Sequence, residues 1–598
     1  MDLNILKHLN KKQKESVINY SGPMVILAGA GSGKTRVLVA KVIYLIKEKN
    51  TSPASIVMMT FTNKAAAEMK ERISRQLGGI VRLGFIGTYH SFCVRVLRIF
   101  WEPAGLNKNF IIYDDDDQKS LIKQIIQEKK LFEKKTPGYF LYYISLAKNQ
   151  MITPENFLEN FKFHSSALVA DVYYHYQKKL EINRGVDFDD LLIKTIYLLQ
   201  KNDDILDYYH NKYKYFLVDE FQDTNYVQYL LTKLLAEKSK NITVVGDFSQ
   251  SIYSWRGADI TNLKKFESDF KGTKIFYLEK NYRSTQNILD FAYSVISKNS
   301  THPILHLFTD NKKGEEIVFY QADNEQAEAI YAAEEIIRLN NGADIRDPPT
   351  FAILYRTNAQ SRVLEEVFLH YGIPYILVGG TRFYERREIK DVLAYLKLLI
   401  NPNESVSLER IKKLGKKRFE KFKKLYEEIK DKLETVSTNE IVEKLFQNVD
   451  YLELYDVEDE EDFGRLENIK ELKSVALNFP KLIEFLEQVA LVESEYFEHE
   501  KKTRESRQLV LMTLHQAKGL EFDYVFIVGV EEGLLPHSRS INDQFQLEEE
   551  RRLFYVGITR AKKVLYITNT RKRFIFGSQG YSTPSRFIAD EQTSHSLL

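Results

Sequence analysis

Short apolar runs rich in β-branched residues alternate with helical stretches along most of this 598-residue chain. A first set of runs reads MVILAG, SIVMMTFT, YFLVDE, ITVVGD and KIFYLE, and a second reads TFAILYRT, IPYILVGG, RQLVLMTLH, YVFIVGV and VLYITNT. Continuous apolar strands that alternate with helices are typical of parallel sheets covered by helices on both faces. The sequence therefore predicts an α/β protein with two parallel-sheet cores.

The strand pattern disappears twice, between FIIYDDDD and DFDDLLIKT and again between IKDVLAYLKLLI and RESRQLVLM. Long charged stretches with few glycines and prolines, which are typical of solvated helices, take its place. We therefore expect a mainly helical insertion in each core. The expected ranges are 1–105 with 190–275 for the first core, 106–189 for its insertion, 276–390 with 507–590 for the second core, 391–506 for its reduced insertion, and 591–598 for a short tail.

The amino-acid composition excludes a few classes of protein but does not by itself indicate the function. The single cysteine, Cys93, excludes an internal disulfide framework, and the 12 histidines show no zinc-ligand spacing. The N-terminus lacks the apolar region of a signal peptide, and no apolar stretch approaches the roughly 18 residues that a membrane span requires. We expect a soluble cytoplasmic protein. The net charge of +2 neither demands nor excludes a nucleic-acid partner.

The segment AGAGSGKT (28–35) follows an apolar strand and precedes an amphipathic helix. Glycines let backbone N–H groups approach phosphates, and the N-terminus of the following helix favours negative charge. In such a loop Lys34 reaches the β- and γ-phosphates, and the Thr35 hydroxyl ligates Mg²⁺. The alternative is a plain glycine turn. The predicted phosphate loop comprises Ala28, Gly29, Ala30, Gly31, Ser32, Gly33, Lys34 and Thr35.

Adjacent carboxylates, Asp219 and Glu220, end the apolar run YFLVDE. In a parallel sheet this position opens onto the ligand crevice, so Asp219 can hold Mg²⁺ and Glu220 can accept the proton of an attacking water. The alternative is a helix cap after a strand. Together with Lys34 and Thr35, the pair favours hydrolysis of a nucleoside triphosphate.

Ten segments, in order, resemble the motifs of the UvrD/PcrA/Rep superfamily 1A DNA helicases: LNKKQ, AGAGSGKTR, TFTNKAAAEM, GTYHSF, LVDEFQDTN, VVGDFSQSIYSWRGAD, LEKNYRST, YRTNAQSR, TLHQAKGLEFDYVFI and EEERRLFYVGITRAKK. The resemblance implies two RecA-like cores and an ATP- and Mg²⁺-dependent helicase. Such an enzyme moves 3′ to 5′ on single-stranded DNA and unwinds duplex in repair or replication. Its implied partners are single-stranded DNA and single-strand/duplex junctions, and we expect a monomer or weak dimer.

The resemblance also implies nucleotide contacts beyond the phosphate loop. Adenine is read by Gln13 and stacked on Tyr282, Gln250 meets the γ-phosphate or its water, and Glu521 meets the ribose. Arg36 belongs to the same nucleotide site. Two arginine fingers, both expected from the second core, complete the implied set: Arg283 and Arg560.

By the same resemblance, aromatic faces stack on bases without sequence preference and polar groups meet the DNA backbone. The stacking candidates are Phe61, Tyr253, Trp255 and Phe576, with Arg256 beside Trp255. The backbone candidates are Asn63, Thr88, His90, Arg356, Asn358 and His515. The alternatives are core aromatics and structural histidines.

The second insertion departs from the family pattern, because IKKLGKKRFEKF stands where an RGIG signature is expected. Its lysines present charge either to duplex phosphates or only to solvent. One alternative function is therefore a single-strand DNA translocase that does not unwind duplex. A small-molecule phosphotransferase would leave Trp255 and Tyr253 unexplained, and a non-enzymatic scaffold would not need Lys34 or Glu220.

Overall fold

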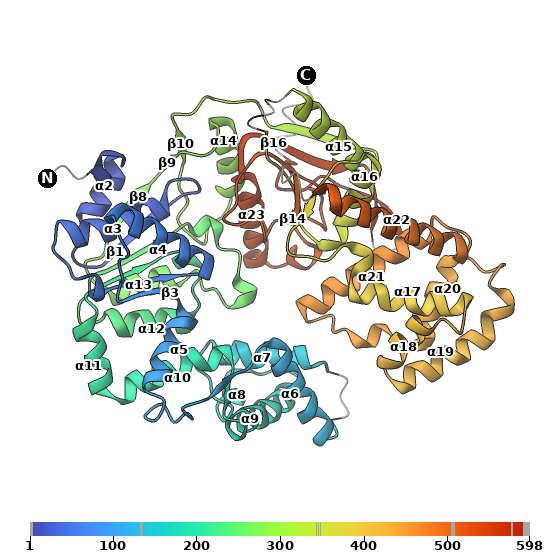
Figure 1. The fold of residues 1–598 in the computed structure, drawn as a ribbon, viewed down its shortest axis with the longest axis horizontal. Helices are drawn as coiled ribbons and strands as arrows, with labels where there is room; N and C mark the ends of the chain where they lie inside the picture. The colour runs from blue at the N-terminus through green and yellow to red at the C-terminus, as the bar shows by residue number, and fades with distance from the viewer. Residues whose placement is uncertain are drawn as a thin grey trace. The chain divides into compact units, whose positions relative to one another are not determined.

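The computed structural model describes residues 4–131, 135–342, 344, 346, 348–503, 509–575 and 578–589. The chain divides into two compact units (Figure 1). The first unit comprises Met1–Arg283 and Ile296–Asn311, and the second comprises Ser284–Val295 and Lys312–Leu598. Each unit contains a six-stranded sheet. The predicted α/β class with two parallel-sheet, RecA-like cores is confirmed.

All strand pairs of the first sheet are parallel, in the order β3-β2-β6-β7-β1-β8. The strands are β1 (Met24–Ala28), β2 (Ile56–Thr60), β3 (Phe85–Thr88), β6 (Tyr215–Val218), β7 (Ile242–Gly246) and β8 (Lys274–Leu278). Successive side chains of β1 enter different cores, because side chains alternate between the faces of a sheet: Val25 and Leu27 join one cluster, Ile26 and Ala28 the other. Both faces are therefore buried.

Helices cover each face of the first sheet. On one side the buried cluster draws on α2 (Lys11–Ile18), α3 (Lys34–Lys47) and α4 (Asn63–Leu77). On the other it draws on α5 (Tyr89–Ile99), α10 (Phe188–Lys201), α12 (Tyr226–Ala236) and α13 (Asn262–Asp269). Two further helices of this unit are α1 (Asn4–Lys7) and α11 (Asp203–Lys212).

The first insertion is helical, as expected, and has its own buried cluster. Its helices are α6 (Asp115–Glu128), α7 (Pro137–Lys148), α8 (Phe157–Asn160) and α9 (Ser166–Ile182). The short strands β4 (Ile111–Ile112) and β5 (Gly185–Val186) pair at its base. A buried ion pair joins the insertion to the core, because Lys148 Nζ at the end of α7 lies 2.6 Å from Asp187 and 2.8 Å from Asp190, which begin α10.

The second sheet is also parallel throughout, in the order β11-β16-β15-β12-β14-β13. Its strands are β11 (Val318–Ala322), β12 (Phe351–Tyr355), β13 (Ile376–Leu377), β14 (Leu509–Thr513), β15 (Phe522–Ile527) and β16 (Ala561–Thr570). The helices of this core are α14 (Gln286–Ile296), α15 (Glu325–Asn341), α16 (Ser361–His370) and α23 (Gln544–Ile558). A hairpin of β17 (Lys572–Ile575) and β18 (Ser578–Tyr581) follows β16.

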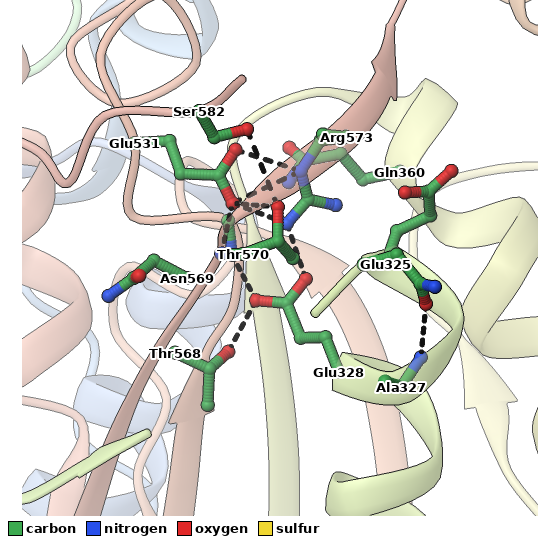
Figure 2. Close-up of polar contacts among 12 residues, drawn as sticks. Glu325, Ala327, Glu328, Gln360, Glu531, Thr568, Asn569, Thr570, Arg573 and Ser582 are labelled. Carbon is green, nitrogen blue, oxygen red and sulfur yellow. Dashed lines mark hydrogen bonds and ion pairs between the residues drawn. The ribbon is translucent and has the colours of Figure 1, made fainter. Parts of the chain in front are cut away.

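A buried cluster of charges ties that hairpin to the second core (Figure 2). Arg573 Nη2 lies 2.7 Å from Glu531 Oε1 and 2.5 Å from Glu328 Oε2. The hydroxyl of Thr568 donates to Glu328 at 2.6 Å, and the backbone N–H of Thr570 donates to Glu531 at 2.8 Å. These polar groups satisfy one another away from water, as buried charges must.

The second insertion is helical as well and has a separate buried cluster. Its helices are α17 (Arg387–Ile400), α18 (Ser405–Lys413), α19 (Lys416–Ile429), α20 (Thr438–Val449), α21 (Glu460–Ala476) and α22 (Leu482–Thr503). Helix α21 is bound to the second core through Arg362, whose Nε donates to Glu471 at 2.7 Å, and through Arg386, whose Nη1 donates to Asn468 at 2.7 Å.

Two expectations about the division of the chain need correction. Strand β8 pairs with β1 along its whole length, so the expected end of the first core at residue 275 falls inside a strand of the first sheet. The first unit continues to Arg283 and regains Ile296–Asn311, where β10 (Phe308–Thr309) pairs with β9 (Lys280–Asn281). Arg283 therefore belongs to the first unit, not to the second as expected.

The short tail expected at 591–598 lies outside the described residues. Within the described ranges, no helix combines the length and the apolar character that crossing a membrane requires.

Candidate functional site

The phosphate loop joins β1 to α3 through a turn that only glycine adopts without strain. Gly31 has φ of 64° and Gly33 has φ of 84°, in the left-handed region. A Cβ atom at Gly31 would lie 2.7 Å from Asn281 Nδ2, and one at Gly29 would lie 2.3 Å from Leu307. Ser32 Oγ closes the turn by donating to the Gly29 carbonyl at 2.8 Å.

Lys34 and Thr35 form the first turn of α3, immediately after that loop. The first N–H groups of a helix lack intrahelical partners, and the helix dipole adds partial positive charge there. The loop and the helix terminus therefore form one position that suits a polyphosphate, and the charge of Lys34 is close enough to Asp219 to lower the pKa of that carboxyl.

Two side chains predicted to meet adenine flank this loop. Gln13 on α2 is fully buried, and its Nε2 donates to the Ser32 carbonyl at 2.9 Å. Tyr282 keeps 43% of its surface exposed, and its backbone N–H donates to the Gly31 carbonyl at 3.0 Å. The Arg36 guanidinium lies 6.0 Å from the Tyr282 ring centroid. The structure thus brings Gln13, Tyr282 and Arg36 to the phosphate loop.

Two asparagines missed by the sequence reasoning hold these groups in place. Asn10 caps α2, and its Nδ2 donates to the Tyr282 hydroxyl at 2.8 Å. Asn281 Nδ2 donates to the Ala30 carbonyl at 2.7 Å, while its Oδ1 accepts from the Arg283 backbone N–H at 2.7 Å. The Asn-x-x-Gln spacing from Asn10 to Gln13 is a capping-box pattern and was the available signal.

The adjacent carboxylates lie at the carboxyl end of β6. Asp219 is buried, and burial together with the neighbouring Glu220 raises its pKa to about 7, although the Lys34 ammonium acts in the opposite direction. Among the residues that the structure describes, Asp219 Oδ1 has no hydrogen-bond partner. A buried carboxylate oxygen without a donor suits a divalent cation, for which carboxylates and hydroxyls are preferred ligands, so Asp219 and Thr35 fit Mg²⁺.

Glu220 adopts a left-handed backbone conformation with φ of 49°, which is uncommon for a residue with a side chain. Its Oε2 accepts from Gln222 Nε2 at 2.5 Å. Gln222 Oε1 in turn accepts from the Asp247 backbone N–H at 3.0 Å, and Gln250 Nε2 donates to Asp247 Oδ2 at 2.6 Å. A polar network that the sequence did not reveal therefore connects Glu220 with Gln250.

Three predicted stacking residues lie together in the first unit. The Phe61 and Tyr253 rings are stacked, with centroids 5.4 Å apart and planes inclined by 12°. Trp255 meets Tyr253 edge-on at 6.4 Å, and the Arg256 guanidinium lies 4.4 Å from the Trp255 ring. Phe61 is 37% exposed and Trp255 is 44% exposed. Such an exposed aromatic group is what a base-stacking surface needs.

The backbone-contact candidates of the first unit occupy helix starts. Asn63 is exposed in the first turn of α4, and Thr88 caps α5 by accepting from the Ser91 N–H at 3.3 Å. His90 packs edge-on against Phe188 at 5.6 Å, and burial lowers its pKa, which favours the neutral imidazole. These helix starts offer N–H groups and short polar side chains to phosphates.

The remaining candidates lie in the second unit. Arg560 is buried, and its Nε donates to the Val556 carbonyl at 2.9 Å and its Nη1 to the Leu520 carbonyl at 3.1 Å. Glu521 pairs with Lys562 at 2.9 Å, and Arg356 pairs with Glu550 through two nitrogens. Asn358 is exposed, His515 is half-buried after β14, and Phe576 lies outside the described residues.

The chain belongs to the UvrD/REP helicase family. Residues 9–271 match the UvrD/REP helicase N-terminal domain, and residues 276–434 and 410–572 match the UvrD-like helicase C-terminal domain. Among curated proteins, the chain is 43% identical to the ATP-dependent DNA helicase PcrA of Bacillus subtilis (strain 168), with 98% of this chain and 86% of the relative covered. It is 42% identical to PcrA of Staphylococcus aureus (strain Mu50 / ATCC 700699) over the same shares.

Proposed function

We propose that this chain is an ATP-dependent DNA helicase that moves 3′ to 5′ along single-stranded DNA and unwinds duplex. One observation carries the proposal. The phosphate loop, the buried Asp219 and the exposed aromatic group of Phe61, Tyr253 and Trp255 all belong to one compact unit. The proposed nucleotide site and the proposed base-stacking surface would thus share one sheet, which supports a link between hydrolysis and DNA binding.

In the proposed hydrolysis, the loop N–H groups and Lys34 hold the triphosphate. Thr35 and Asp219 would hold Mg²⁺, which would neutralise charge on the transferring phosphoryl group. The Glu220 carboxylate accepts a proton from the attacking water, and Gln250 orients that water or the γ-phosphate. Gln13 and Tyr282 select adenine by hydrogen bonding and stacking.

The polar network from Glu220 to Gln250 offers a route from hydrolysis to DNA. Gln250 is followed closely in the chain by Tyr253, and Ser251 Oγ donates to the Gln222 carbonyl at 3.1 Å. A change in the hydrogen bonds of Gln250 on loss of the γ-phosphate therefore reaches the segment that carries Tyr253 and Trp255. We propose that this segment couples the nucleotide state to the stacking of bases.

The second unit supplies two of the remaining groups proposed for the nucleotide. Arg560 serves as an arginine finger and Glu521 as a ribose contact, while Arg283 acts from the first unit beside the phosphate loop. Arg356, Asn358, His515 and Phe576 are proposed DNA contacts, together with Asn63, Thr88, His90 and Arg256 of the first unit. We further propose that the enzyme acts on single-strand/duplex junctions in the cytoplasm as a monomer or weak dimer.

A single-strand DNA translocase is the competing proposal, and the second insertion is the part of the chain that bears on the choice. Helices α18 and α19 are joined at Gly415, whose φ is 119°, and lysines lie on both sides of this turn. Lys413 pairs with Glu409 at 2.8 Å, which places its charge on the surface of α18. A helical hairpin with positive charge suits duplex phosphates, but its sequence differs from the expected RGIG pattern.

Steady-state ATPase activity with and without oligo-dT, followed by strand displacement from a 3′-tailed duplex, tests the proposal. Strong stimulation together with displacement is expected. Stimulation without displacement would favour the translocase, and displacement from a 5′-tailed duplex alone would contradict the proposed polarity. Absence of stimulation would overturn both readings.

A further inference from the structure

Lys41 is a buried lysine in the middle of α3, the helix that begins with Lys34. Its side chain is 1% exposed. Its Nζ donates to the Ser16 carbonyl at 2.9 Å, to the Asn19 carbonyl at 2.7 Å and to Met24 Sδ at 2.8 Å. These three acceptors match the three hydrogens of an ammonium group.

Burying this group works against its charge, because burial lowers the pKa of Lys41 to about 7. A lysine is seldom fully buried unless its nitrogen is satisfied. Two of its acceptors are carbonyls at the C-terminal end of α2 (Lys11–Ile18), where the last carbonyls of a helix lack intrahelical partners and the dipole is negative. Lys41 thus fastens the end of α2 to the middle of α3.

The N-terminal end of helix α2 contacts the phosphate loop. Ser16 Oγ donates to the Gln13 carbonyl at 2.8 Å, and Gln13 Nε2 donates to the Ser32 carbonyl in the phosphate loop at 2.9 Å. The contacts therefore form a closed ring, from α3 through Lys41 to α2, through Gln13 to the loop, and back into α3. Asn10, which binds the Tyr282 hydroxyl, caps the same helix.

We propose that Lys41 is a positioning residue for nucleotide selection, which fixes α2 so that Gln13 meets the base and Asn10 holds the Tyr282 ring that stacks on it. This inference rests on the proposed adenine site. Lys41 and Lys34 are seven residues apart on α3, or about 10 Å along the helix axis. Lys41 therefore acts through α2, whereas Lys34 acts on the phosphates.

The test compares ATP with GTP as substrates for Lys41→Met, Gln13→Ala and Lys148→Met in the full chain. Methionine keeps the length and apolar stem of lysine but donates no hydrogen bond. For Lys41→Met we expect the KM for ATP to rise about 5- to 20-fold, which corresponds to one misplaced hydrogen-bonded contact, with kcat changed less than about twofold. The preference for ATP over GTP should fall as it does in Gln13→Ala.

Lys148→Met is the matched control, because Lys148 is equally buried but joins α7 to α10. It should lower the melting temperature and leave the KM and the nucleotide preference unchanged. A merely structural Lys41 would behave like Lys148. Lys41→Arg keeps a cation with several donors and should restore much of the ATP preference.

The outcomes separate the inference from the proposed site. If Gln13→Ala loses ATP preference and folded Lys41→Met keeps it, the inference is wrong and the adenine site stands. If Gln13→Ala keeps its preference, both are overturned. Should Lys41→Met melt below the assay temperature, Lys41→Gln decides, because its shorter amide does not reproduce the hydrogen bonds of the Lys41 ammonium to both the Ser16 and the Asn19 carbonyls. A wild-type KM and preference in that variant would contradict the inference.

Discussion

The ring of Phe61 lies flat against the ring of Tyr253, with centroids 5.4 Å apart, although the two residues follow different strands of the first sheet. Phe61 follows β2 and Tyr253 follows β7, and both strands are parallel with β6 between them. The carboxyl ends of parallel strands share one edge of a sheet, so the two loops meet there. The same edge carries the phosphate loop, which follows β1.

Removal of the outermost ring of this aromatic group should weaken DNA binding. Trp255→Ala is expected to raise the dissociation constant for oligo-dT about 5- to 150-fold, because base stacking contributes roughly 1 to 3 kcal/mol for each base. The concentration of oligo-dT that half-maximally stimulates ATPase should rise in parallel. Tyr142→Ala, which removes another exposed aromatic from α7, is the control. If Trp255→Ala and Tyr142→Ala had equal effects, Trp255 would have a structural role and would not stack on bases.

Lys34→Ala should abolish ATP hydrolysis while single-stranded DNA binding is largely retained. The reason is that Lys34 lies in the first turn of α3 and is not part of the aromatic group that would hold bases. ATPase rates and fluorescence anisotropy with labelled oligo-dT measure the two properties separately. Simultaneous loss of both would mean that the substitution unfolds the core.

Glu220→Gln should bind ATP yet turn over about 10²- to 10⁴-fold more slowly, which is the usual contribution of a general base. The amide has the size of the carboxylate but does not accept the proton of water. Equilibrium binding of ATP and single-turnover hydrolysis give the two quantities. Turnover at the wild-type rate would remove Glu220 as the base.

The protonation of Asp219 predicts how Mg²⁺-dependent nucleotide binding varies with pH. Burial and the adjacent Glu220 raise the pKa of Asp219 to about 7, so its carboxyl is protonated below that pH and is a poor metal ligand. The apparent Mg²⁺ dissociation constant should rise as pH falls from 8 to 6, by up to about tenfold per unit below the pKa. Asp219→Asn should bind Mg²⁺ weakly at every pH. A flat wild-type profile would contradict Asp219 as a ligand.

The raised pKa of Asp219 also makes the free energy of unfolding depend on pH. Higher pH favours Mg²⁺ binding but lowers the stability of the nucleotide-free protein. The folded state holds the Asp219 proton more tightly than the unfolded chain, so the nucleotide-free protein loses stability as pH rises from about 4 to about 7. At pH 8, Asp219→Asn should therefore stabilise the protein, by about 1 to 3 kcal/mol, and the gain should shrink at pH 5. Urea unfolding at the two pH values measures this difference. Destabilisation at pH 8 would contradict it.

The sequence predicted the sheets well because inner strands such as β1, β7 and β12 are buried on both faces and read as uninterrupted apolar runs. It did not predict the extent of the first unit, since the pairing of β8 with β1 joins segments far apart in the chain. The apolar pattern indicates that Lys274–Leu278 is a strand, but it does not indicate where the unit that contains this strand ends. The misplacement of Arg283 has the same cause.

The sequence predicted the charged and aromatic residues of the candidate site. It did not predict the asparagine and glutamine side chains that hold them in place. Lys34, Asp219 and Glu220 stand in short motifs whose chemistry can be read locally. Asn281 and Gln222 act through hydrogen bonds to backbone or side-chain atoms of other loops, and neither residue type has a fixed chemical role. Only the folded chain reveals such partners.

The chain passes between the two units three times, after Arg283, after Val295 and after Asn311. A single proteolytic cut in this stretch would therefore leave each product with a piece that belongs to the other unit. Tyr282, which we propose stacks on adenine, stands just before the first passage, and α14 of the second unit begins shortly after it. The turn that carries Tyr282 is thus joined to α14 of the second unit by a few residues of continuous backbone. Unlike a non-covalent contact, this connection does not dissociate.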